Sequence, residues 1–142
     1  MNNNIRTLRG RMGEGQRRII VDDGRTNHGY KVLEFAVWNT GVSASGVFGI
    51  LGTQYDMMAF ADASDNRQIA WAGSAWNTAG NDSNANRYSV IDPDHIVITD
   101  LYIRALAPGE TMNYMIVVQP LTMSDDQAIL QLIKERSQDD TR

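Results

Sequence analysis

Short segments in which apolar and polar residues alternate, each followed by turn-forming residues, run through most of the chain. The clearest segment is residues 30–39, whose alternating apolar members are Leu33, Phe35 and Val37. Such a period of two is typical of a strand with one buried face. Further strands are expected at 17–21, 67–72, 88–91, 95–106 and 111–119, and two more between 42 and 60 with a boundary near Gly52. Because strands spaced by turn signals every 8–12 residues or so indicate a sandwich or barrel, we predict a mainly β fold, a β-sandwich or jelly-roll.

Two connections in this pattern can be anticipated from their residue types. The sequence Ala107-Pro108-Gly109-Glu110 suits a type II turn, so the segments on either side of it are expected to form a hairpin. Residues 75–86 are rich in Asn, Asp, Ser and Gly, and are expected to form a polar loop that contains Trp76.

Both ends of the chain depart from the strand pattern, which divides it into three parts. Residues 1–16 contain few apolar side chains to offset the entropy of ordering, so we expect a flexible N-terminal arm. Residues 17–123 form the β body. Residues 124–142 are expected to form a C-terminal amphipathic helix followed by a polar tail.

Charge distinguishes the N-terminal arm from the body. The first eighteen residues carry five arginines and one glutamate, a formal charge of +4, and the whole chain has a net charge of −4, so the remainder carries −8. Arginine suits bidentate pairing with carboxylates at interfaces. The segment lacks aromatic residues, which disfavours stacking on single-stranded nucleic acid. The candidate partner-binding residues here are Arg6, Arg9, Arg11, Arg17 and Arg18.

The C-terminal helix is predicted from its start signal. Ser124 and Gln127 have the spacing of a capping box, and two aspartates lie in the first turn, where the helix dipole favours negative charge. The apolar face is expected to include Ile129, Leu132 and Ile133, and it can pack on the body or bind a partner.

Residue types that carry catalysis are sparse. The chain has no Cys and only two His, and no nucleophile elbow or phosphate-binding loop, so we predict no catalytic, cofactor or metal site. The clusters around Asp62 and around Asp92 are expected to form turns rather than calcium sites. No apolar run reaches the roughly 18 residues of a membrane span, so no membrane partner is expected.

The three tryptophans are the remaining candidates for a binding surface. Trp38 and Trp71 lie in strand patterns and are expected to fill space in or between the sheets. Trp76 is expected in a polar loop, where exposure and a subunit contact are both open.

Several stretches resemble small β-rich structural proteins of marine tailed phages and related viruses. These stretches are residues 21–25, 27–32, 65–71, 92–95 and 121–129. The resemblance implies a virion component, with capsid decoration (cement) proteins among the kinds it includes, and it leaves head and tail locations open.

From this we predict a capsid decoration protein, located in the virion, that assembles as a homo-oligomer, a trimer by preference. Its arm would pair with carboxylates of the major capsid protein, and nucleic acid is not the expected partner. The alternatives are a tail, neck or head-completion component, and a carbohydrate-binding module that grips its ligand through Trp76. An enzyme is not expected, because clustered His and carboxylates are lacking.

Overall fold

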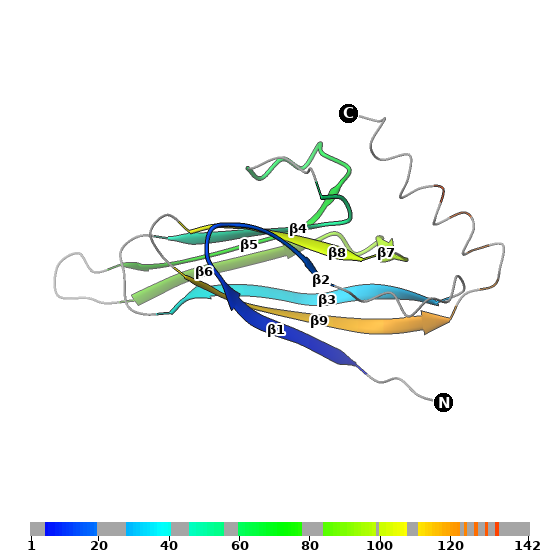
Figure 1. Cartoon of the computed structure of the whole chain (residues 1–142), viewed down its shortest axis with the longest axis horizontal. Helices are drawn as coiled ribbons and strands as arrows, with labels where there is room; N and C mark the ends of the chain where they lie inside the picture. The colour runs from blue at the N-terminus through cyan, green and yellow to red at the C-terminus, as the bar shows by residue number, and fades with distance from the viewer. Residues whose placement is uncertain are drawn as a thin grey trace.

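In the computed structural model the chain forms two antiparallel sheets that lie face to face (Figure 1). The structure describes residues 5–19, 28–40, 46–55, 60–77, 84–98, 100–107 and 111–122, with residues 124, 127, 130 and 133, but not the side chains of 75–77 and 84–86. The strands are β1 (Arg6–Met12), β2 (Gly15–Ile19), β3 (His28–Asn39), β4 (Val47–Gly52), β5 (Gln68–Asn77), β6 (Asn84–Ile91), β7 (Ile96–Val97), β8 (Leu101–Leu106) and β9 (Met112–Thr122). The prediction of a mainly β sandwich is confirmed.

The two sheets differ in strand number and order. The first, here called sheet A, has the order β1-β9-β3-β7, and the second, sheet B, has the order β2-β8-β4-β5-β6. Alternate residues of each strand face the opposite sheet, so the core is a layer of apolar side chains between them. Its largest fully buried members include Phe35, Leu51, Leu101, Ile103, Met112 and Ile116. Burial of each side chain of this size contributes about 1.5–3 kcal/mol.

The N-terminal segment is not the flexible arm that we expected, over the part that the structure describes. Residues 6–12 pair with β9, from Arg6 opposite Val118 to Met12 opposite Met112, and residues 15–19 pair with β8. The physical reason is a weak alternation that the arginines obscure, because Leu8 and Met12 face the core while Arg9 and Arg11 face outward.

Glycines permit the path of this segment. A Cβ on Gly10 would lie 2.8 Å from the Tyr114 hydroxyl, so the absence of a side chain lets Tyr114 pack beneath β1. Gly15 has a φ of 137°, a conformation that side chains disfavour, at the turn where the chain passes from sheet A to sheet B (Figure 1, dark blue).

A β-bulge changes the alternation expected in residues 30–39. The pairing of β3 with β9 shifts between Val32 and Glu34, so Leu33 is an extra residue in the strand. Val32 is consequently buried, Leu33 is 38% exposed, and Phe35 and Val37 again face the core. The prediction was therefore wrong for Leu33 and right for the other two apolar residues.

Two further expectations are corrected. The strands on either side of residues 107–111 do not form a hairpin, because β8 belongs to sheet B and β9 to sheet A. Within the expected loop at 75–86, residues 75–77 belong to β5 and residues 84–86 to β6, and these strands pair as far as Asn77 and Asn84, while residues 78–83 lie outside the described residues. Turn-forming residue types therefore marked the regions in which one strand ends and the next begins, but they did not predict which strands pair.

Most of the predicted C-terminal helix lies outside the described residues. Where it is described, Ser124 and Gln127 make the two reciprocal bonds of a capping box. The Gln127 amide donates to the Ser124 Oγ at 3.2 Å, and the Ser124 amide donates to the Gln127 Oε1 at 3.1 Å. The helix as a whole stays a prediction, and the described residues include no helix long and apolar enough to cross a membrane.

Candidate binding surface

Two of the five N-terminal arginines hold the fold together. The Arg18 Nε donates to the Oδ2 of buried Asp100 at 2.6 Å, which ties β2 to the residue before β8. The Arg17 Nη1 donates to the Arg11 carbonyl and to the Tyr114 hydroxyl, both at 3.3 Å, and its guanidinium lies 5.9 Å from the Tyr114 ring centre. The Arg17 contacts therefore join β2 of sheet B to β1 and β9 of sheet A, whereas the Arg18 contact lies within sheet B.

The other three arginines are on β1. The Arg6 guanidinium lies 5.8 Å from the centre of the buried Tyr30 ring. Arg9 and Arg11 are exposed on the outer face of sheet A, and neither forms an ion pair with any residue that the structure describes. They are the two cations of the predicted set that remain available to a partner.

A shallow groove of about 610 Å³ lies beside these two arginines. It crosses β1, β9 and β3, and is lined by Arg9, Gly10, Arg11, Trp38, Asn113, Tyr114 and Met115. The strand register explains this arrangement: Asn113 lies between Arg11 and Trp38, and Met115 lies opposite Arg9. We call this hollow the arginine groove.

Trp38, one of the residues that line the arginine groove, is also contacted from sheet B. The Arg87 guanidinium, from β6, lies 5.9 Å from the centre of the Trp38 ring. Two residues further along β6, the Ser89 Oγ donates to the Phe35 carbonyl at 2.6 Å. This bond holds β6 against β3 at a position that β7 does not reach, because β7 pairs only with Tyr30 and Lys31. Arg87 therefore contacts the same tryptophan that lines the arginine groove.

The chemistry that the arginine groove offers is anion binding. Guanidinium groups pair with carboxylates or phosphates in a planar, bidentate geometry, and Trp38 and Met115 add apolar contact area. The lining has amide, phenol and guanidinium groups but no carboxylate or imidazole. No group of three or more His, Cys, Asp or Glu side chains is placed to hold a metal ion within the described ranges.

The remaining predicted partner-binding residues do not join the arginine groove. Trp76 lies in β5, where its backbone pairs with Ala85, and its side chain is not described. Ile129 and Leu132 lie outside the described residues, and Ile133 is 58% exposed.

Sequence reasoning missed the groove residues contributed by β3 and β9, and the contact that Arg87 of β6 makes with Trp38. The alternation in 112–118 could have identified Asn113 and Met115, because the buried residues of that segment fix which positions face outward. Nothing in the sequence indicates that Arg87 reaches Trp38, since this contact depends on how the two sheets meet.

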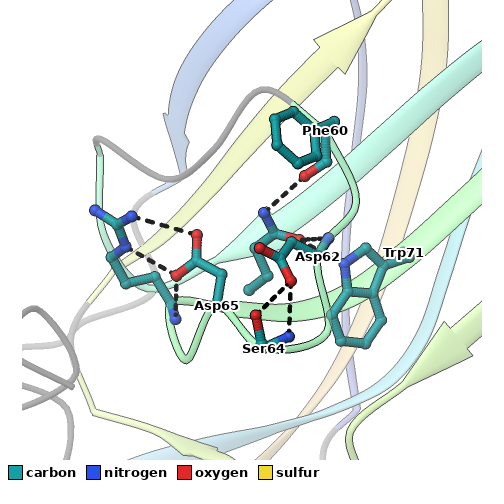
Figure 2. A network of polar contacts seen from close by, with 7 residues as sticks. Phe60, Asp62, Ser64, Asp65 and Trp71 are labelled. Atoms are coloured by element: carbon teal, nitrogen blue, oxygen red, sulfur yellow. Dashed lines mark hydrogen bonds and ion pairs between the residues drawn. The ribbon is translucent and has the colours of Figure 1, made fainter. Parts of the chain in front are cut away.

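The aspartates near residue 62 form a turn, as predicted. The Asp62 Oδ1 accepts hydrogen bonds from the Ser64 amide and hydroxyl, at 2.9 and 2.6 Å. Asp65 is fully buried, and its Oδ1 pairs with the Arg67 Nε at 2.9 Å (Figure 2). Both carboxylates are thus occupied by partners from the turn itself.

The outer face of sheet B carries a second exposed feature, here called the apolar patch. Tyr88 and Val90 of edge strand β6 are 52% and 55% exposed, and the ring centres of Tyr88 and Phe48 are 6.0 Å apart. Partial burial raises the pKa of the Tyr88 hydroxyl above its usual value. Exposed aromatic residues on a sheet face are typical of protein contacts.

Comparison with protein-family models, curated proteins and solved structures gave no match.

Proposed function

We propose that this protein is a structural component of a virion, a capsid decoration (cement) protein that binds the major capsid protein. The strand order supports a jelly-roll arrangement, an architecture that is common in viral capsid proteins. In a jelly roll of eight strands the first, eighth, third and sixth share one sheet. β6 can be counted as an added strand at the edge of sheet B. When the other eight strands are numbered in chain order without it, sheet A has the order first, eighth, third and sixth.

The observation that carries the proposal is the arginine groove. Arg9 and Arg11 are exposed cations without ion-pair partners among the described residues, in a chain whose net charge is −4. Their chemistry fits carboxylates on a protein surface. Individually weak contacts of this kind become effective when a shell repeats them many times, through avidity.

The proposal includes a homo-oligomer, a trimer by preference. The apolar patch supports it, because partly exposed Phe48, Tyr88 and Val90 can be covered by a neighbouring subunit. The capped C-terminal segment would supply a second attachment, on the protein's own body or on a neighbour.

Immunogold labelling of purified particles from cells that express the gene tests the location. Label on the head at three-fold positions supports a decoration protein, label on the tail or neck supports the alternative virion role, and particles without label overturn both. Light scattering of the purified protein measures the oligomer. Deletion of residues 2–16 would not test the contact, because it would also remove β1 from sheet A.

The double variant Arg9→Glu/Arg11→Glu tests the contact itself, by cosedimentation with shells that lack the protein. It is expected to bind at least about tenfold more weakly, because like charges replace paired ones. Lys31→Gln, at the far end of sheet A, is the control for a general change of charge, and it should bind as the parent does.

A further inference from the structure

We propose that the outer edge of β1 takes up an extended acidic segment of the partner protein as an additional strand, with acidic side chains at positions i and i+2 opposite Arg9 and Arg11. This inference rests on the proposed function, since it names the kind of segment that these arginines bind. It goes further in assigning part of the recognition to the main chain of β1.

The first support is that the edge is open. β1 is the terminal strand of sheet A, and on the side away from β9 no strand of the described chain pairs with it. The Arg11 carbonyl points away from β9, because it accepts a hydrogen bond from Arg17, a residue of the other sheet, and an added strand would replace this 3.3 Å contact. Carbonyls of residues two apart point the same way along a strand, so the carbonyl of Arg9 faces the same edge.

The second support is the spacing of the charges. Arg9 and Arg11 lie on the same outer face, two residues and about 7 Å apart. Acidic side chains at alternate positions of an added strand have the same spacing. Each would lie opposite an arginine, where oppositely charged cross-strand pairs are favourable.

The same charges disfavour pairing with a second copy of β1. Two such edges in antiparallel register would bring arginines against arginines, and like charges across a strand pair are destabilising. An open strand edge that is cationic on its outer face is thus protected from self-association, yet suited to an acidic strand.

A peptide also fits this edge better than a nucleic acid does. The edge of a strand offers amide donors and carbonyl acceptors in alternation, and the main chain of another strand satisfies both kinds. A phosphate backbone accepts hydrogen bonds but donates none, so it would leave the carbonyls of β1 without partners.

The test uses the full chain and a fluorescent eight-residue peptide that alternates aspartate with valine, measured by fluorescence anisotropy. Three companion probes are a peptide with lysine for aspartate, a peptide of the same acidic sequence with N-methyl groups on the amides that face β1, and oligothymidine. Only the acidic, unmethylated peptide should bind, and its binding should weaken as salt is raised.

Variants then assign the charges. Arg9→Gln/Arg11→Gln should weaken binding of the acidic peptide about tenfold, the sum of two cross-strand ion pairs, whereas Lys31→Gln should change it less than about twofold. Arg9→Glu/Arg11→Glu should exchange the preference, binding the lysine peptide in place of the acidic one. All substituted side chains are at the surface of strands, so circular dichroism should show the parent fold.

Equal binding of the N-methylated and unmethylated peptides would overturn strand addition, and equal binding of the lysine peptide would overturn the charge assignment. Tighter binding of oligothymidine would replace the inference with a nucleic-acid site. These measurements need no virion, so they are independent of particle labelling. Failed peptide binding with successful labelling would reject strand addition alone, and successful peptide binding with unlabelled particles would reject the virion role alone.

Discussion

The side chain of Gln68, at the start of β5, bonds to Phe60 and Asp62 of the β4–β5 connection and to Trp71 of β5, so its removal is a sharp test of how that connection is held (Figure 2). Gln68 is 4% exposed. Its Oε1 accepts from the Asp62 amide at 2.9 Å and from the Trp71 Nε1 at 2.7 Å, and its Nε2 donates to the Phe60 carbonyl at 3.0 Å. Gln68→Ala removes all three hydrogen bonds at once.

The expected cost follows from these bonds. Each contributes about 1 kcal/mol net, and the three groups left behind are only partly buried, so water can reach them and the full penalty for unsatisfied groups does not apply. We therefore expect Gln68→Ala to lower the free energy of unfolding by about 3 kcal/mol, with a fall in Tm of roughly 10 °C for a domain of this size. Urea unfolding followed by circular dichroism measures the change.

Two further variants divide this total. Trp71→Phe removes one donor and should cost about 1 kcal/mol through the lost bond, and its effect should largely disappear in the Gln68→Ala background, a coupling of about 1 kcal/mol. Gln68→Glu keeps the acceptor but places a carboxylate oxygen against the Phe60 carbonyl at a buried position, so its cost should be greatest at neutral pH and smaller at low pH, where the protonated carboxyl can donate. A loss below about 0.5 kcal/mol for Gln68→Ala would refute the view that this side chain holds the connection.

Three other predictions concern the bulge, the buried ion pair and pH. Val32→Thr should lower the free energy of unfolding in a urea titration by more than about 1 kcal/mol, because Val32 is buried. Leu33→Thr should lower it by less than about 0.5 kcal/mol, and similar losses for the two variants would contradict the bulge. Asp65→Asn leaves Arg67 without its buried carboxylate and should cost about 3 kcal/mol, as thermal unfolding would show, and an unchanged Tm would contradict it. The pKa of Tyr88 is raised in the folded chain, so its contribution to stability is present below about pH 10 and is lost above it. Absorbance at about 295 nm should show a late-titrating tyrosine that Tyr88→Phe removes, and an unchanged titration would speak against it.

Much of the sheet structure could be predicted because alternation is local. Residues 101–106 and 112–118 have buried residues at every second position, and both were expected as strands. Turn residues likewise predicted the Asp62–Asp65 turn, whose amide-to-carbonyl bond is 3.0 Å. These features depend on residues a few positions apart, which a sequence shows directly.

Pairing between distant strands could not be predicted in the same way. β1 is stabilised by the main chain of β9, about a hundred residues later, so its own sequence needs few apolar side chains and was mistaken for a flexible segment. The bulge at Leu33 also depends on the partner strand, because two residues of β3 face one of β9 there.

The candidate site was found only in part for the same reason. Arg9 and Arg11 were identified by their charge, which composition shows without a structure. Trp38, Asn113 and Met115 join them only through the register of three strands, and Arg87 only through contact between the sheets. The charged residues of the site could thus be predicted from the sequence, but the residues that lie around them could not.

The pairing of the two N-terminal strands with the last two has a consequence for how the chain folds. Arg6 lies opposite Val118, and Gly15 lies opposite Ala105, so neither edge can form until most of the chain has been synthesised. Folds dominated by such distant contacts close slowly, on a scale of about milliseconds to seconds. Until β8 and β9 have been synthesised, the exposed cations of β1 would hinder aggregation of the unpaired strands. The residues proposed to bind a partner would thus have a second role, in protecting the incomplete chain.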